Sequence, residues 1–139
     1  MFLKELKLTN FRKFESLKVN FQKGLNILVG EHDSGKTAIV DAIRYTLNTK
    51  SFENIRFEPR DFYKPTKVTD IDPQPERADT FTITAIFSDF KEQEAAKFIE
   101  WGYFNENKGF ELRLFLKAKL LDNDRITWDI KAGPSGAET

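Results

Sequence analysis

A glycine-rich stretch between an apolar run and an amphipathic segment is the dominant feature of the sequence. Residues 25–37 read Leu-Asn-Ile-Leu-Val-Gly-Glu-His-Asp-Ser-Gly-Lys-Thr, which contains the pattern Gly-x-x-x-x-Gly-Lys-Thr. Gly30 and Gly35 allow the backbone to turn tightly, so that successive N–H groups face one concavity, and the next helix adds the positive end of its dipole. The pattern predicts a phosphate-binding loop, in which Lys36 reaches the β- and γ-phosphates of a nucleotide and the Thr37 hydroxyl binds Mg²⁺.

The residues on either side supply the strand and the helix that such a loop requires. The apolar run over residues 25–29 is typical of a strand buried on both faces of an α/β sheet. Beyond the loop, apolar residues recur at helical spacing, which predicts a helix over about residues 36–48. This context favours a nucleotide site over a turn that only joins strand to helix. The expected nucleotide contacts in this stretch are Gly30, Glu31, His32, Asp33, Ser34, Gly35, Lys36, Thr37 and Ala38.

Composition limits the remaining possibilities. The chain has 139 residues, 40% of them hydrophobic, which is enough for the core of one domain. The formal net charge of zero argues against a stand-alone nucleic-acid-binding protein. There is no cysteine, the N-terminus is too charged for a secretory signal, and no run of about 18 apolar residues occurs. These features predict a cytoplasmic protein.

An antiparallel pair of strands is expected before the loop. Leu6 and Leu8 share one face of a first strand, and apolar residues alternate with polar ones over residues 17–22. The turn between these strands carries two cations, Arg12 and Lys13, between aromatic residues. Basic residues are frequent in this region, but alternation along the strands is expected to spread them over different faces.

The second half of the chain predicts more strands. Residues 51–63 have no clear period, and residues 64–79 are rich in Pro, Asp, Thr and Gln, which predicts an exposed insertion loop. Residues 80–88 alternate as a half-buried strand, and a helix is expected from Asp89 to Gly102. Residues 110–116 and 126–130 predict a hairpin around the turn at 122–124. The small, turn-rich residues 132–139 are expected to end inside a larger protein.

Three stretches carry a resemblance to a known family. They are residues 6–14 (Leu-x-Leu-Thr-Asn-Phe-Arg-x-Phe), 24–37 (Gly-Leu-Asn-x-Leu-Val-Gly-Glu-x-Asp-Ser-Gly-Lys-Thr) and 41–44 (Asp-Ala-Ile-Arg). Together they resemble ATPases of the chromosome-maintenance and recombination group (SMC/RecF-like), and most of all the overcoming-lysogenisation-defect (OLD) family of ATP-dependent endonucleases. The resemblance is specific over about residues 1–63 and only topological from Thr80 onward.

The resemblance implies an α/β fold of the P-loop NTPase type, with some α+β character. Residues 1–139 would be the N-terminal lobe of an ABC-type ATPase domain, built from a mixed sheet, the P-loop helix and antiparallel hairpins. In the OLD family this domain dimerises around ATP and Mg²⁺, and a Toprim nuclease domain that follows cuts DNA; several members act in phage defence. The implied partners are therefore ATP, a second copy of the chain and, through the full-length protein, DNA.

Carried over by position, the resemblance places Arg12 in a turn that approaches the nucleotide. The alternative for Arg12 is an exposed cation on a turn. His32 departs from the Asn usual in relatives and Asp33 from Gly or Asn, so that His32 is either a phosphate contact or a solvated loop residue. Asp61, in Arg-Asp-Phe-Tyr, is either functional or a structural cap.

Two parts of a complete ABC-type ATPase are not found in the sequence. One is an apolar strand ending in Asp-Glu; the nearest candidate ends at Asp89, which is followed by Phe90 and is better explained as a helix cap. The other is the signature motif, which a partner supplies. We therefore expect no catalytic residue within the chain, and expect the chain alone to bind nucleotide without useful turnover.

Two other functions remain open. One is the ATPase lobe of a recombination or condensin-type (RecF/SMC-like) protein without a nuclease, which a downstream heptad region would favour. The other is a small stand-alone P-loop nucleotidase or kinase, which would need an acceptor-binding lid and a catalytic base within the chain. No carboxylates stand at nuclease-site spacing, so the nuclease is implied by the resemblance alone.

Overall fold

The computed structural model describes residues 2–24, 26–27, 35–47, 56–65, 76–97, 102–105 and 109–133. Most of the predicted loop, including Gly30, Glu31, His32, Asp33 and Ser34, lies outside the described residues. So do positions 28–29 of the preceding apolar run, the middle of the 64–79 insertion and the last six residues.

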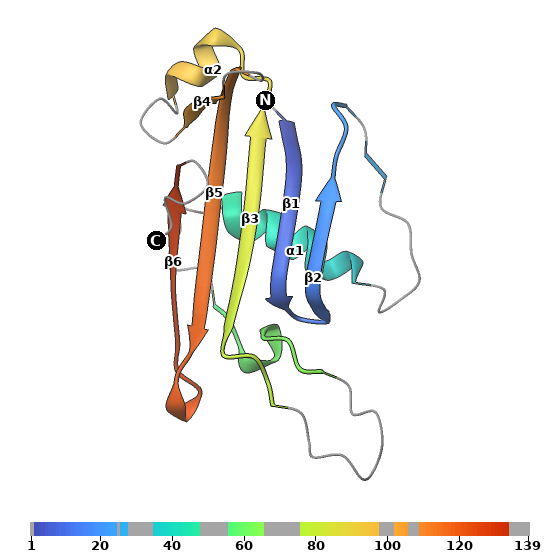
Figure 1. Cartoon of the computed structure of the whole chain (residues 1–139), viewed down its shortest axis with the longest axis vertical. Helices are drawn as coiled ribbons and strands as arrows, with labels where there is room; N and C mark the ends of the chain where they lie inside the picture. Colours follow the sequence, from blue (N-terminus) through green and yellow to red (C-terminus); the bar gives the residue numbers. More distant parts are fainter. Residues whose placement is uncertain are drawn as a thin grey trace.

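The described residues form a six-stranded sheet with one long helix against it (Figure 1). The strands are β1 (Phe2–Phe11), β2 (Phe14–Asn20), β3 (Thr80–Ser88), β4 (Tyr103–Asn105), β5 (Gly109–Leu120) and β6 (Ile126–Ala132). Their order is β2-β1-β3-β5-β4, and β6 also pairs with β5. All pairings among these strands are antiparallel.

The helix α1 (Lys36–Leu47) lies behind the sheet in Figure 1 and confirms the helix predicted after the loop. Ala38 and Ala42 are buried, and their small side chains allow the helix axis to lie close to the strands. On the sheet, the side chains facing α1 are those that the alternation predicts. They are Leu6, Leu8, Ile83, Ala85, Leu114, Leu116 and Ala118, all buried.

An aromatic cluster fills the end of this core. Phe81 of β3 is fully buried, and its ring centroid lies 4.9 Å from that of Phe11, 5.1 Å from that of Phe57 and 4.8 Å from that of Phe62. Phe57 also packs edge-on against Trp128 of β6. These rings connect residues 56–62, which the sequence did not allow us to place, to both halves of the sheet.

The strands and the hairpin predicted in the second half are confirmed. β3 has the predicted bounds of residues 80–88, β5 is longer than predicted at both ends, and β6 is longer at its C-terminal end. Asn123 and Asp124 have φ angles of +67° and +59°, which Asn and Asp tolerate better than most residues, so the turn falls where the sequence placed it.

The interpretation of Asp89 as a helix cap is wrong. The helix α2 (Glu92–Lys97) begins three residues later, too far for Asp89 to accept hydrogen bonds from its first turn. Instead, Asp89 has a φ of +58° and forms an ion pair with Lys23, which lowers the pKa of Asp89. Gly102 does not end this helix within the described residues; it lies against the Phe110 ring, and a Cβ there would be 2.7 Å from Cε2.

The apolar run before the loop also differs from prediction at the described positions. Asn26 and Ile27 are not in a strand, and Ile27 is 74% exposed. A strand is buried on both faces when helices or another layer cover both faces of its sheet. None of the described strands pairs with Ile27, so the described residues do not place it in such a sheet. Within the described part of the chain, no helix has the length and apolar character needed to cross a membrane.

We expect Phe81→Ala to lower the free energy of unfolding by about 3–5 kcal/mol, because the ring is fully buried among three others. Urea unfolding followed by circular dichroism measures the change. Val40→Ala is the control, since Val40 is 45% exposed and its truncation should change stability by less than about 0.5 kcal/mol. Equal losses in both variants would contradict the placement of Phe81 in the core.

Candidate functional site

The N-terminus of α1 is the described part of the predicted phosphate loop. The Ile39 N–H donates to the Gly35 carbonyl at 3.2 Å, which makes Gly35 the residue before the first helical turn. Helix geometry then leaves the N–H groups of Lys36, Thr37 and Ala38 outside the internal hydrogen bonds of the helix. No acidic residue occupies this first turn, so the positive end of the helix dipole is not neutralised by its own side chains.

Gly35 is required by its surroundings as well as by its backbone. Its φ is +98°, a conformation that favours glycine, and a Cβ there would lie 2.6 Å from Cε2 of Phe14 and 3.2 Å from Cδ of Lys13. The loop end therefore packs directly on the turn between β1 and β2. This contact holds the start of α1 and the Arg12–Lys13 turn in one place.

Arg12 joins that turn to α1 and to the 59–62 segment. Its Nη1 donates to Oδ2 of Asp41 at 2.7 Å, and its Nε donates to Oδ1 of Asp61 at 3.0 Å. Nη2 lies 3.4 Å from the Tyr45 hydroxyl, and the guanidinium lies 4.9 Å from the centroid of the Phe11 ring. Burial lowers the pKa of Arg12, but its hydrogen bonds to both carboxylates and their negative charges outweigh burial and raise the pKa above its ordinary value.

Asp61 is the buried end of this network, with 5% of its surface exposed. Its Oδ2 accepts from the Glu58 N–H at 2.9 Å, and its backbone carbonyl accepts from the Arg12 N–H at 2.7 Å. It belongs to a short 3₁₀ helix, η2 (Pro59–Asp61). Of the two alternatives for Asp61, these bonds favour a structural role in fixing the segment beside Arg12.

A cleft of about 520 Å³ lies beside this network. Its lining comes from the β1–β2 turn, α1 and the segments on both sides of the insertion: Arg12, Lys13, Thr37, Asp41, Arg60, Asp61, Phe62, Lys64 and Arg77. Five of these residues are cationic, and both acidic ones are paired with Arg12. The cleft therefore has a positive excess close to the start of α1.

The structure brings together two of the predicted site residues in this cleft, Arg12 and Thr37. Lys36, in the same helical turn as Thr37, is half-buried, and Ala38 faces the core. The other predicted contacts, at positions 30–34, lie outside the described residues.

Sequence reasoning missed Asp41, Lys64 and Arg77 as part of the cleft. The four-residue spacing of Thr37 and Asp41 on one helix face was the available signal for Asp41. Lys64 and Arg77 flank a long insertion, so only the fold reveals that they are close. Arg77 donates to the carbonyls of Pro59 and Phe62 at 3.0 and 2.9 Å. These bonds hold the residue that follows the insertion beside the 59–62 segment and the cleft.

Comparison with known proteins supports an ATPase. A model of the family described as AAA ATPase domain matches residues 1–131. DNA replication and repair protein RecF of Lactococcus lactis subsp. cremoris (strain MG1363) is 45% identical over 51 residues, which are 37% of this chain and 14% of that protein. Chromosome partition protein Smc of Halothermothrix orenii is 42% identical over 57 residues, which are 40% of this chain and 5% of that protein. The matched segment is thus a small part of each relative.

A solved structure also has a similar fold. It comes from work on the "structural biochemistry of ATP-driven dimerization and DNA stimulated activation of SMC ATPases". The alignment covers 96% of this chain and 73% of that chain, with a TM-score of 0.56 and 15% identity. At this identity the likeness shows the fold alone, and it confirms the predicted P-loop, ABC-type ATPase fold.

We expect Asp61→Asn to lower the free energy of unfolding by about 1–3 kcal/mol, because it weakens a buried, charge-assisted contact to Arg12. Urea unfolding measures the loss. Lys23→Gln is the matched control: it breaks the Lys23–Asp89 pair, whose side chains are 76% and 49% exposed, and should leave the urea midpoint close to that of the unsubstituted chain because solvent screens the pair. A loss at Asp61 no larger than at Lys23 would show that the network does not hold the segment.

Proposed function

Because the chain belongs to the AAA ATPase domain family, we propose that it is the ATP-binding N-terminal lobe of a RecF- or SMC-like ATPase. In this proposal ATP with Mg²⁺ controls the pairing of two copies, and the full-length protein acts on DNA. One observation supports the nucleotide site above all others: the N-terminus of α1 opens beside a cationic cleft, and Thr37 belongs to both.

The described residues fit ATP and Mg²⁺. The N–H groups at the start of α1 suit phosphate oxygens, and the glycine that precedes them leaves no side chain between the loop and Phe14. Lys36 would bind the phosphates as a cation, and the exposed Thr37 hydroxyl would bind Mg²⁺. The cleft volume of about 520 Å³ lies within the range of small-molecule sites, and Lys13 and Lys64 line it.

Arg12 has a more limited place in this proposal than the resemblance implied. Three of its nitrogen atoms already donate to Asp41, Asp61 and Tyr45. A guanidinium carries five N–H donors, so a nucleotide could still accept one while Arg12 stays in the network. We propose that Arg12 acts first as a positioning residue, which keeps its turn against Gly35 and the cleft.

The proposal of dimerisation and DNA as partners is supported by the relatives. The names of two of them refer to DNA replication and repair and to chromosome partition, and the structural neighbour comes from work on ATP-driven dimerization and DNA-stimulated activation. An OLD-type endonuclease in phage defence stays a prediction. None of these names mentions a nuclease, and in the described part of the chain no three His, Asp or Glu side chains gather as a metal site.

Lys36→Ala tests the nucleotide site. Charge-assisted hydrogen bonds contribute roughly 1.5–3 kcal/mol, so ATP should bind about 10- to 150-fold more weakly in calorimetric titrations. Lys91→Ala, which removes an exposed lysine away from the cleft, should leave the dissociation constant within about twofold. An unchanged affinity in Lys36→Ala would remove Lys36 from the site.

Thr37 should act through the metal. We expect Thr37→Ala to reduce ATP affinity more in the presence of Mg²⁺ than in its absence, because the hydroxyl is first a metal ligand. Thr37→Ser keeps the hydroxyl and should retain the Mg²⁺-dependent part of the affinity. Equal losses with and without metal in Thr37→Ala would make Thr37 a structural residue of the helix terminus.

A further inference from the structure

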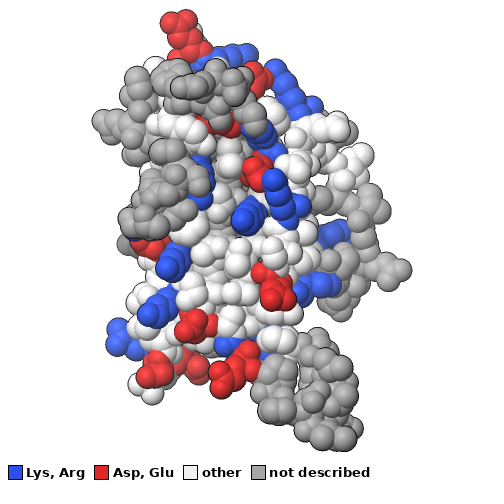
Figure 2. Space-filling model, viewed as in Figure 1, with Lys and Arg blue, Asp and Glu red and all other residues white. Residues whose placement is uncertain are grey.

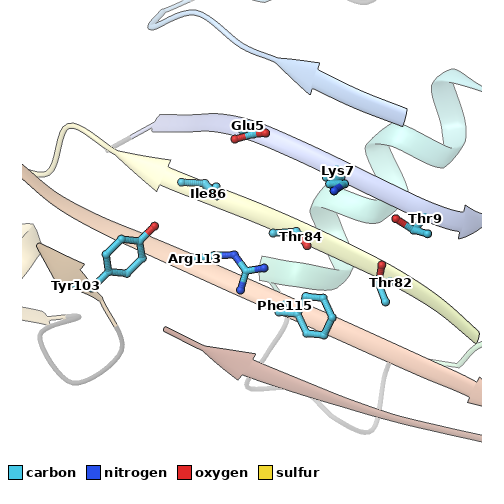
Figure 3. A pocket seen from close by; sticks show the side chains of 9 residues that line it. All are labelled: Glu5, Lys7, Thr9, Thr82, Thr84, Ile86, Tyr103, Arg113 and Phe115. Atoms are coloured by element: carbon cyan, nitrogen blue, oxygen red, sulfur yellow. The ribbon is translucent and has the colours of Figure 1, made fainter. Parts of the chain in front are cut away.

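The sheet has a second face, opposite α1, that we call the open face. Cross-strand pairing defines it: Glu5, Lys7 and Thr9 of β1 lie opposite alternate residues of β2 and β3. Side chains of this set point away from α1 in Figure 3 and line a groove of about 350 Å³. The lining residues are Glu5, Lys7, Thr9, Thr82, Thr84, Ile86, Tyr103, Arg113 and Phe115.

The open face is strongly basic, although the chain has no net charge. By strand register and ion pairing, its cations are Lys4, Lys7, Lys18, Arg113, Lys117, Lys119 and Lys131. Its acidic residues are Glu5, Glu111 and Asp129. Figure 2 shows Lys and Arg side chains across this face of the molecule, with Asp and Glu side chains among them and toward its lower end. Arg113 and Glu111 are buried, so the accessible charges of this face are six cations and two carboxylates. They leave an excess of four positive charges on one surface.

Three of these cations lie in one row across the strands. Lys18, Lys7, Thr84, Phe115 and Lys131 are successive cross-strand neighbours from β2 to β6. The next row, displaced by two residues, contains Ser16, Thr9, Thr82, Lys117 and Asp129. At about 4.8 Å between strands, a row of five residues spans roughly 19 Å. The same length of a nucleic-acid strand carries about five or six phosphates, at roughly 3.4 Å each.

The pairing of Lys7 with Lys18 is not favoured by folding alone. Like charges directly opposite each other destabilise a sheet. Among the described residues, Lys18 has a carboxylate partner, Glu5, at 3.1 Å, and Lys7 has none. Thr9 of β1 and Thr82 and Thr84 of β3 also line this face. Lysine ammonium and threonine hydroxyl groups are the side chains that commonly donate to phosphate oxygens.

We propose that the open face binds the phosphodiester backbone of a nucleic acid. The proposal deepens the proposed function by giving its DNA partner a surface on this lobe, separate from the nucleotide cleft. A second copy of the chain fits this face less well, because a symmetric pairing would bring the lysine rows against each other. A membrane also fits less well, because the large apolar side chains described on the open face, Ile86, Tyr103 and Phe115, are half-buried and offer little surface to insert into lipid.

The test compares the DNA affinity of two triple variants by fluorescence anisotropy, with labelled duplex DNA of about 30 base pairs and single-stranded DNA of about 30 nucleotides. The open-face variant lacks three exposed cations of this face and carries Lys7→Gln, Lys117→Gln and Lys119→Gln. The control variant loses the same charge from exposed positions outside this face and carries Lys23→Gln, Arg56→Gln and Lys91→Gln.

At roughly 0.1 M salt each lysine that neutralises a phosphate should contribute about 5- to 10-fold to affinity, so the open-face variant should lose at least about 100-fold. Its slope of log affinity against log salt should become shallower by about 2–3 units, while the control should lose less than about tenfold. The form of DNA that binds more tightly identifies the preferred ligand. Urea midpoints close to that of the unsubstituted chain establish that both variants are folded.

Three results would overturn the proposal: no DNA binding by the unsubstituted chain at low salt, equal losses in both variants, or a need for the same lysines only in self-association or in binding to phosphatidylserine vesicles. ATP titration of the open-face variant separates the two proposals. The open-face variant should bind ATP with the affinity of the unsubstituted chain, whereas Lys36→Ala should lose affinity for ATP and keep its affinity for DNA. If the unsubstituted chain binds no ATP, the proposed nucleotide site is rejected, whereas the proposal for the open face is unaffected.

Discussion

The contact of Arg12 with Asp41 and Asp61 is the interaction on which the arrangement of the cleft depends. The three residues come from a strand turn, a helix and a 3₁₀ segment, and the Arg12 side chain joins these three elements. Arg12 is suited to this position because its planar guanidinium can donate to two carboxylates at once. Without it, two acidic side chains would face each other beside a site proposed for anionic phosphates.

Backbone hydrogen bonds also hold the 59–63 segment against β1. Arg12 donates its N–H to the Asp61 carbonyl, and the Tyr63 N–H donates to the Asn10 carbonyl, so the segment is added to the end of β1 like a short extra strand. Phe62 enters the core at this point and packs on Phe81. The polar network and the aromatic cluster therefore support each other, because each fixes the same backbone from a different side.

The parts of the fold that follow a local period were predictable from the sequence, and the site was predictable only where a motif carries it. β3 alternates because one face is buried against α1, and α1 follows directly from its apolar spacing. Residues 56–62 have no period, since their burial comes from Phe57 and Phe62 meeting rings distant in sequence. Asp61 and Arg77 likewise gain their partners only after the sheet has brought separate segments together.

Net charge alone does not describe how charge is distributed over this molecule. A value of zero argues against nucleic-acid binding only if charges are distributed evenly, and in this fold they are not. β1 places Leu6 and Leu8 in the core and Lys7 on the open face, so alternation along one strand separates apolar packing from positive charge. The acidic residues that balance the total lie elsewhere, for example Asp122 and Asp124 at the β5–β6 turn and Asp41 and Asp61 around Arg12. A chain that is neutral as a whole can thus present a basic surface for an extended polyanion, because alternate residues of each strand face opposite sides of the sheet.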